Sequence, residues 1–497
     1  VDDVSDVELP ELVLPLEPEL ELDEEDADSG IDVGPAPKLD SAGASGWQAS
    51  AANTVIGGLD PTVHYGLDSD RNNGSARVAG LRHVHRFDHG SELTTQVRMG
   101  NFDRDQRASA IRFAAAALQP GGSAADGSSF ATGTLLTRGT NLKIQNVQTT
   151  QLQSDFSHRF KTAGLQHELL AGVDFSREAK TAQTPLTAAQ GGVDLVKPAI
   201  TAASTSGGGW VDEDARVLRD SSRFTARSLG VYAQDMVQVA PHWKLLGGLR
   251  HDRMSGYYDT LAIPANAPGP VTTTSYQQAI SAWSPRLGVL YQPNALQSFH
   301  FSYGTSFSTS GDAYSYNAQS ANTPPEQSQN LELGAKLDNA AKTFSTRLAL
   351  FRSTKLNERN TDPDTAAAQE LLSGKRHATG MEFNLAGRLT PKWELFFNHT
   401  WIPDAKIDRS NVVLAANGGG AQVQGDRPGL TPKHSGSVWS TYAVTSKLRV
   451  GAGLTYRAKQ NPEGSRAVYA SGFAVVDAMA EYAFDDKTSL KLNVSNL

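Results

Sequence analysis

The chain has 497 residues, of which 39% are hydrophobic and none is cysteine, and its formal net charge is -8. No segment approaches the roughly 18 to 20 apolar residues that a membrane-spanning helix needs, so a helical membrane protein is excluded. The lack of cysteine excludes a disulfide scaffold, a thiolate zinc site and a cysteine nucleophile. A membrane β-barrel is still allowed, because its strands alternate apolar and polar residues.

The negative charge is concentrated at the start of the chain. Residues 1–40 hold fifteen Asp or Glu against one basic residue, Lys38, so the rest of the chain has 44 Lys and Arg against 38 acids. We interpret residues 1–46 as an acidic, Pro- and Leu-rich disordered arm, with a partner-binding tail as the alternative. The mildly basic remainder, 47–497, suits anionic ligands or lipids, but its excess is too small to indicate nucleic acid.

From about residue 75 the chain repeatedly alternates apolar and polar residues with period 2, which predicts β-strands. Met381, Phe383 and Leu385 share one face of a segment, for example, and Glu382 and Asn384 share the other. Sixteen strands are predicted: 77–87, 91–104, 144–160, 166–178, 222–238, 243–256, 275–291, 298–308, 329–337, 343–355, 376–388, 392–404, 433–444, 447–459, 472–484 and 488–497.

The predicted connections alternate between short and long. Short ones include 88–90, 240–242, 390–392, 445–447 and 485–487, and the long ones span 106–143, 179–222, 257–274, 309–326, 356–375, 403–432 and 458–470. An outer-membrane barrel has tight periplasmic turns and long outer loops. Aromatic residues also flank the short turns, as an interfacial girdle would: Trp243, Trp393, Tyr442, Tyr482 and Phe484. The pattern favours an all-β, transmembrane antiparallel β-barrel over a large soluble β-protein.

The direction of the strands predicts an incomplete barrel. If the short turns are periplasmic, the first predicted strand runs inward and the last runs outward, so both ends of the series lie on the outer side. Bacterial barrels normally start and finish in the periplasm. We therefore expect an interior portion of a larger barrel, incomplete at both ends.

Several strings in this chain resemble the barrel of TonB-dependent outer-membrane receptors, and within them the catecholate-type ferric-siderophore receptors. They are YGLDSDRNNGS (65–75), NFDRDQRASAIRF (101–113), SLGVYAQD (228–235) with LLGGLRHD (245–252), PPEQSQNLELGAK (324–336), GDRPGLTPKHSGSVWSTY (425–442) and LKLNVSNL (490–497). The resemblance covers about 60–497. It implies a 22-stranded barrel, of which this chain would supply strands 6 to 21, with a plug domain and a TonB box before it. Neither the plug nor a TonB box is found in this sequence.

The resemblance also implies a function. Such receptors perform no bond-making chemistry and need no cofactor; they bind a ferric siderophore at the outer face of a Gram-negative outer membrane. Uptake is driven by the TonB–ExbB–ExbD system acting through the plug. No P-loop, GxSxG elbow, HExxH or dinucleotide fingerprint occurs, so an enzyme is not expected. Two alternatives are a passive porin-like channel, since sixteen strands is also a porin count, and a surface receptor or adhesin that uses its long loops.

A ferric tris-catecholate is anionic with aromatic faces, so basic and aromatic side chains on long loops or outer strand ends suit it. The candidate ligand-binding residues are Arg104, Arg107, Arg112, Trp210, Tyr257, Tyr258, Tyr314 and Tyr316. For each one taken alone, a solvated loop residue or a lipopolysaccharide contact is the competing interpretation.

For the other titratable residues, a structural or solvated role is favoured over metal binding. His83 and His85 have a spacing that can bind a transition metal, but a lumen or headgroup position is the favoured interpretation. Asp362 with Asp364, and the run 212–214, could hold Ca²⁺, with solvated acids favoured. No metal site is predicted. The remaining charges are expected to form salt-bridge ladders inside the barrel: Glu382, Arg388, Glu394, Arg449 and Arg457.

Overall fold

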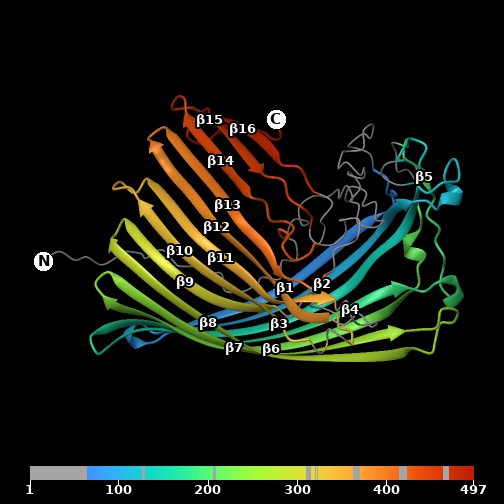
Figure 1. The fold of residues 1–497 in the computed structure, drawn as a ribbon, viewed down its shortest axis with the longest axis horizontal. Coiled ribbons are helices and arrows are strands. Elements are labelled where there is room, and N and C mark those ends of the chain that lie inside the picture. The colour runs from blue at the N-terminus through green and yellow to red at the C-terminus, as the bar shows by residue number, and fades with distance from the viewer. Residues whose placement is uncertain are drawn as a thin grey trace.

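A computed structural model describes residues 64–125, 129–204, 209–308, 315–318, 321, 323–361, 370–412, 422–462 and 469–497. The predicted arm, residues 1–46, lies outside them, so its boundary at residue 47 stays a prediction. The described residues form an all-β structure of seventeen strands and a few one-turn 3₁₀ helices (Figure 1). No helix among them is long and apolar enough to cross a membrane.

The strands run in chain order around one sheet. They are β1 (Arg71–Arg86), β2 (Glu92–Phe113), β3 (Leu135–Thr162), β4 (Leu165–Pro185), β5 (Ile200–Thr201), β6 (Leu218–Ala240), β7 (Trp243–Ala262), β8 (Thr272–Asn294), β9 (Gln297–Ser308), β10 (Glu326–Asp338), β11 (Phe344–Thr361), β12 (Glu370–Thr390), β13 (Trp393–Arg409), β14 (His434–Ala443), β15 (Leu448–Arg457), β16 (Phe473–Ala483) and β17 (Ser489–Val494). The 3₁₀ turns are Asp88–Gly90, Ala116–Leu118, Ala188–Gln190 and Glu213–Ala215.

Each long strand pairs antiparallel with the next long strand along the chain, from β1 to β17. The sheet curves into a trough, with β6 and β7 at its floor and β10 to β16 forming the near wall in Figure 1. The sixteen long strands correspond one to one with the sixteen predicted segments. β5 is the additional strand: its two residues pair with Leu135 and Leu136 of β3, inside a predicted long loop.

The strands begin or end within a few residues of the predicted short turns, but they extend further at the other end. β2 continues to Phe113, and β3 begins at Leu135 rather than 144. These extensions keep full antiparallel register, so the long loops are shorter than expected. The sequence hides them because the regular alternation of apolar and polar residues that marks the predicted strands is interrupted in these extensions.

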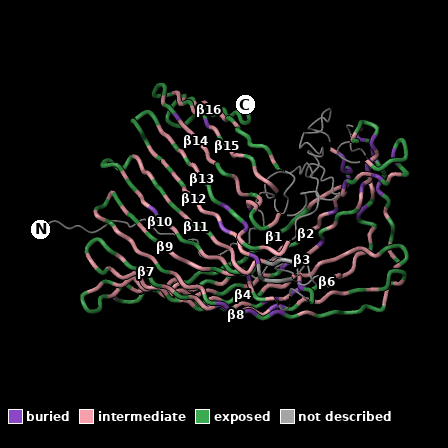
Figure 2. Tube along the Cα trace, in the orientation of Figure 1, coloured by how far each residue is buried: buried purple, intermediate pink, exposed green. Residues whose placement is uncertain are grey.

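The alternation of side chains gives the sheet two unlike faces. Met99, Leu152 and Val173 lie on the outward face and are about half exposed, as expected of a surface that lipid rather than protein covers. The predicted girdle residues Trp243, Trp393, Tyr442, Tyr482 and Phe484 are also substantially exposed near the short turns. Few residues are buried anywhere along the strands (Figure 2), as expected of a single curved sheet without a central core.

Candidate ligand-binding site on the inner face

The inner face of β3 to β7 carries a ladder of charged and hydroxyl groups. Arg250 Nη1 lies 2.7 Å from Asp174 and its Nε donates to Asp252 at 2.9 Å. The Arg250 guanidinium also lies 5.3 Å from the centre of the Tyr232 ring, and the Tyr232 hydroxyl bonds to Asp155. These groups satisfy one another, which is what allows so many polar groups on one partly buried surface.

A second ladder crosses β12 to β15. Glu394 accepts from Arg388 at 3.0 Å and from Thr441 at 3.2 Å, and it also pairs with Arg449. Arg457 lies over the Phe473 ring, 4.9 Å from its centre. The five residues predicted to form lumen ladders all lie on this inner face by register: Glu382, Arg388, Glu394, Arg449 and Arg457.

An aromatic cluster occupies the inner face at the long-loop end of the floor strands. Phe224 of β6 and Tyr258 of β7 lie in contact with Tyr316, which comes from the segment between β9 and β10. The ring centres of Phe224 and Tyr316 are 5.6 Å apart, and those of Tyr258 and Tyr316 are 6.5 Å apart in an edge-to-face arrangement. Tyr276 of β8 packs against the same group.

Tyr316 is inserted into this cluster rather than lying on a solvated loop. Only 6% of its surface is exposed, and its hydroxyl lies where a side chain at position 256 would be, so the cluster requires Gly256. Burial raises the pKa of the Tyr316 phenol, and the nearby Glu178 carboxylate raises it further. The phenol therefore stays protonated and can donate a hydrogen bond to an anion.

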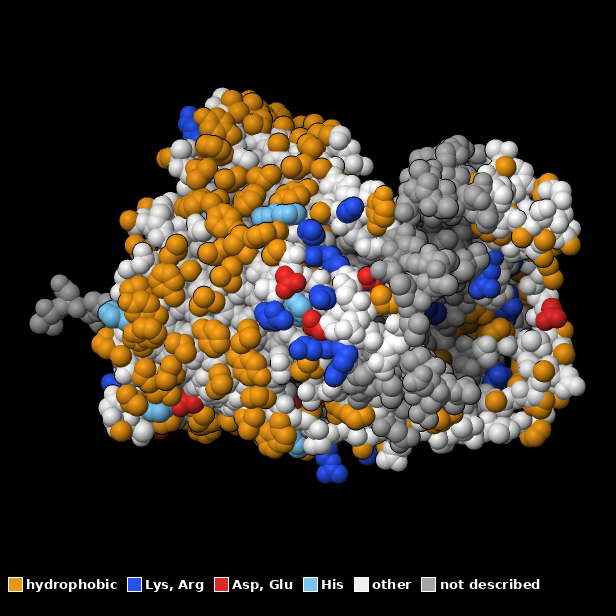
Figure 3. Space-filling view, viewed as in Figure 1, with side chains coloured by type: hydrophobic (Ala, Val, Ile, Leu, Met, Phe, Trp, Pro, Cys, Tyr) orange, Lys and Arg blue, Asp and Glu red, His pale blue; other side chains and the backbone are white. Residues whose placement is uncertain are grey.

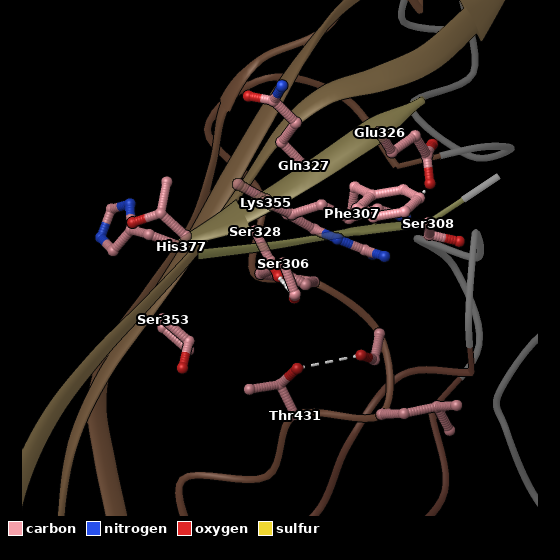
Figure 4. Close-up of a pocket in the computed structure, with 16 residues that line it drawn as sticks. Ser306, Phe307, Ser308, Glu326, Gln327, Ser328, Ser353, Lys355, His377 and Thr431 are labelled. Atoms are coloured by element: carbon pink, nitrogen blue, oxygen red, sulfur yellow. Dashed lines mark hydrogen bonds and ion pairs between the residues drawn. The ribbon is translucent and has the colours of Figure 1, made fainter. Parts of the chain in front are cut away.

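A separate cavity of about 490 Å³ lies between β9 to β12 and the segment 428–431 (Figure 4). Its wall is rich in hydroxyl groups, from Ser306, Ser308, Ser328, Ser353 and Thr431. Lys355 enters it and forms ion pairs with Glu326 at 2.9 Å and Glu358 at 3.6 Å. Arg376 pairs with Glu358 at 3.0 Å, so two cations and two acids share this part of the wall.

Arg427 holds the rim of the cavity in place. Its Nε donates to the Thr431 carbonyl at 2.7 Å and its Nη2 to the Ile402 carbonyl at 2.6 Å. Burial lowers the pKa of Arg427, partly offset by Asp404, but a guanidinium remains charged at any ordinary pH. Arg427 therefore positions the 428–431 segment, a role that the sequence did not suggest.

Of the predicted ligand-binding residues, four face inward. Arg104 and Arg112 share the inner face of β2, where Arg104 donates to Asn72 at 3.0 Å and Arg112 is exposed. Tyr258 and Tyr316 belong to the aromatic cluster. The prediction did not include Phe224, Tyr276, Lys355 or Arg376, although the predicted strands 222–238, 275–291, 343–355 and 376–388 contain them.

The other four predicted residues lie elsewhere. Arg107 is on the outward face of β2, 7% exposed, and pairs with Asp105 at 2.7 Å and Asp214 at 3.2 Å. Tyr257 lies on the outward face of β7, and Trp210 is 68% exposed beside the segment 211–217. Tyr314 lies outside the described residues.

A buried network of charged side chains, which we call the lock, connects the long segment 186–217 to the outer ends of β1 to β3. The lock consists of Asp70, Lys197, Glu213 and Arg216. The side chain of Lys197, 1% exposed, lies 3.1 Å from Asp70 and 3.3 Å from Glu213, which is itself buried. Glu213 also pairs with Arg216 at 2.6 Å. Burial alone would raise the pKa of Glu213, but Arg216 and Lys197 outweigh it and hold the pKa below its usual value.

The residues considered for metal binding have other surroundings. His83 and His85 lie on the outward face with ring centres 6.3 Å apart, and Glu213 is engaged by the lock. Asp362 and Asp364 lie outside the described residues. Within the part of the chain that the structure describes, no group of three or more His, Asp or Glu side chains has an arrangement that could hold a metal ion.

Comparison with known proteins identifies the family to which this chain belongs. The sequence model of the family described as TonB dependent receptor-like, beta-barrel matches residues 23–497. The catecholate siderophore receptor Fiu of Escherichia coli (strain K12) is 25% identical over 489 residues, which is 92% of this chain and 61% of Fiu. The chain thus spans about three fifths of the length of that relative.

Solved structures show the same fold. The closed form of the ferric-catecholate import receptor Fiu from K12 E. coli superimposes with a TM-score of 0.73 and 22% identity, over 87% of this chain and 61% of that one. The siderophore receptor PiuA from Acinetobacter baumannii gives the same TM-score and identity, over 87% and 62% of the two chains.

Proposed function

Because the chain belongs to the TonB-dependent receptor β-barrel family, we propose that it binds a ferric siderophore for uptake across the outer membrane of a Gram-negative bacterium. The observation that carries this proposal is the aromatic cluster around Tyr316 at the long-loop end of the inner face. An aromatic surface on a polar, inward-facing wall is a suitable receptor for a ligand with aromatic rings and polar substituents.

The ligand class that fits best is an anionic ferric catecholate. Its rings can stack edge-to-face with Tyr258, which the buried Tyr316 supports, and its negative charge can be met by Arg104 and Arg112 on the same inner face. The name of the relative Fiu, a catecholate siderophore receptor, supports the same class. We extend the proposal to Trp210, Tyr257 and Tyr314 as outer contacts during capture, and to Arg107 as a residue that orders the segment 211–217 beside Trp210.

Release into the periplasm would require energy from the TonB–ExbB–ExbD system, acting through a plug as in other members of the family. The chain itself would contribute no bond-making chemistry and no cofactor, and iron would be part of the cargo. Outer-membrane lipid, including lipopolysaccharide, would surround the outward face.

Binding of a ferric tris-catecholate to the protein isolated from outer membranes tests this function. Replacing Tyr316 with Ala should weaken binding about tenfold, which corresponds to roughly 1.4 kcal/mol. Quenching of intrinsic fluorescence would report the affinity. Tyr303→Ala on the outward face of β9 is the matched control and should bind like the wild type.

Three outcomes distinguish the competing functions. Saturable chelate binding that Tyr316→Ala weakens supports a siderophore receptor. Ohmic conductance in planar bilayers without saturable binding would instead support a passive channel. If neither conductance nor chelate binding is seen, the surface-receptor function replaces the proposed one.

A further inference from the structure

The outward face of β11 to β13 changes abruptly from apolar to charged. On β11, Leu348 and Leu350 are followed on the same face by Arg352, and on β12, Phe383 and Met381 are followed by His377 and Lys375. Figure 3 shows hydrophobic side chains covering this wall toward its short-turn end, and charged side chains gathering where that surface stops. The boundary marks the edge of the bilayer on the long-loop side.

The same change occurs on β13, so the boundary is continuous across three strands. Trp401, 40% exposed, is the last large apolar side chain on the outward face, and Lys406 follows it beyond a β-bulge. Lys406 lies directly opposite His377 in the β12–β13 register. A tryptophan at this height is typical of the level of lipid headgroups.

The acids within the charged surface are engaged by one histidine. His377 Nε2 lies 3.0 Å from Asp404, and its Nδ1 lies 2.8 Å from Asp408. Each nitrogen of this imidazole therefore faces one carboxylate. The two carboxylates together carry at most two negative charges.

The surrounding cations outnumber that charge. Arg352 is exposed and donates to the neutral Thr379 at 3.2 Å. Lys375 and Lys406 form no ion pair with any of the described residues, and Lys406 is exposed. These three residues, which we call the cationic patch, therefore leave net positive charge just beyond the apolar surface.

We propose that the cationic patch binds the phosphate groups of an anionic glycolipid in the outer leaflet, with its acyl chains lying against Leu350, Met381 and Trp401. Phosphate accepts charge-assisted hydrogen bonds from Lys and Arg, and basic residues at a bilayer surface attract anionic headgroups. The continuous apolar surface below the patch favours a lipid over a free phosphate. The proposal rests on the membrane orientation given above, but not on the identity of the siderophore.

Binding of fluorescent diphosphoryl lipid A to the protein in neutral detergent tests the proposal. The variant Lys375→Gln with Lys406→Gln should bind about 25-fold more weakly, roughly fivefold for each charge removed. The control variant, Lys392→Gln with Lys487→Gln, removes two charges near the short turns and should bind like the wild type. Dephosphorylated lipid A should bind the wild type as weakly as diphosphoryl lipid A binds the first variant.

The phosphate contact would be overturned by equal loss in both variants, by no loss in either, or by equally tight binding of lipid A with and without its phosphates. Acyl-free glucosamine disaccharide bisphosphate should bind far more weakly than lipid A, and equal binding would reject a lipid as the occupant. Chelate binding measured on the same preparations separates this proposal from the receptor function, because the patch faces outward and the Tyr316 cluster faces inward.

Discussion

At the scale of single residues, Lys197 is the side chain on which the long segment 186–217 most depends. It is inaccessible to water and bridges Asp70 and Glu213. Lys197→Met removes the cation and leaves two carboxylates without it, and breaking a buried pair in this way costs about 3–5 kcal/mol. We expect the segment to open locally while the strands persist. Hydrogen exchange at the amides of Ala202 and Val211 would measure the loss.

An exposed ion pair provides the control for that prediction. Arg223 pairs with Asp220 at 2.8 Å, but the arginine side chain is 59% exposed. Arg223→Met should therefore change local stability by less than about 1 kcal/mol. If both variants change exchange at Ala202 equally, Lys197 has no special role in holding the segment.

The same lock should respond to acid. The pKa of Glu213 is lower in the folded protein than in the unfolded chain, so the lock is fully stabilised above the ordinary glutamate pKa, about 4.3. The stabilisation is lost as the pH falls through the depressed value. Proteolysis of the segment with an acid-active protease should therefore be slow at pH 5 and accelerate below about pH 4. In Glu213→Gln the segment should be equally open at both pH values.

At the scale of elements, two glycines of β7 offer a matched pair. A Cβ atom at Gly256 would lie 2.2 Å from the Tyr316 hydroxyl, whereas a Cβ at Gly247 would meet nothing within 4 Å. Gly256→Ala should displace Tyr316 from the aromatic cluster and weaken chelate binding about tenfold, like the loss of the ring. Gly247→Ala should leave binding unchanged. Equal affinities for the two variants would show that the cluster does not contact the chelate.

The elements themselves were largely predictable from the sequence. The apolar–polar alternation located sixteen strands because lipid on one side and polar surface on the other impose period 2 on each. The alternation disappears beyond the bilayer, so the extension of β3 to Leu135 was missed. β5 was missed because two residues, Ile200 and Thr201, carry no pattern at all.

The candidate site was less predictable than the strands. A residue of suitable type contributes to it only if its side chain lies on the inner face of the sheet. Arg107 and Arg112 both follow the predicted strand 91–104, but their separation of five residues places them on opposite faces of β2. Tyr258 could be placed on the inner face from the sequence, because side chains alternate between the two faces along a strand. The burial of Tyr316 could not be predicted, since it depends on how an irregular segment folds back onto β6 to β8.

At the scale of the whole molecule, the sheet has two faces and two ends, and each has its own chemistry. The apolar outward face is bounded by aromatic residues near the short turns and, on β11 to β13, by the cationic patch at the other end, while the inner face is mostly polar outside the aromatic cluster. If the cationic patch contacts the anionic glycolipid of the outer leaflet, as we propose, the short turns face the periplasm.

This orientation can be tested directly, because the sequence has no cysteine and a single introduced thiol is unambiguous. Trp210→Cys places a thiol on an exposed position at the long-loop end, and Lys487→Cys places one on a short turn. A maleimide attached to a polymer too large for general porins should label the first variant on intact cells. It should label the second only after the outer membrane is permeabilised. The opposite pattern would invert the molecule, move the cationic patch to the inner leaflet and remove the basis for both the ligand and the lipid proposals.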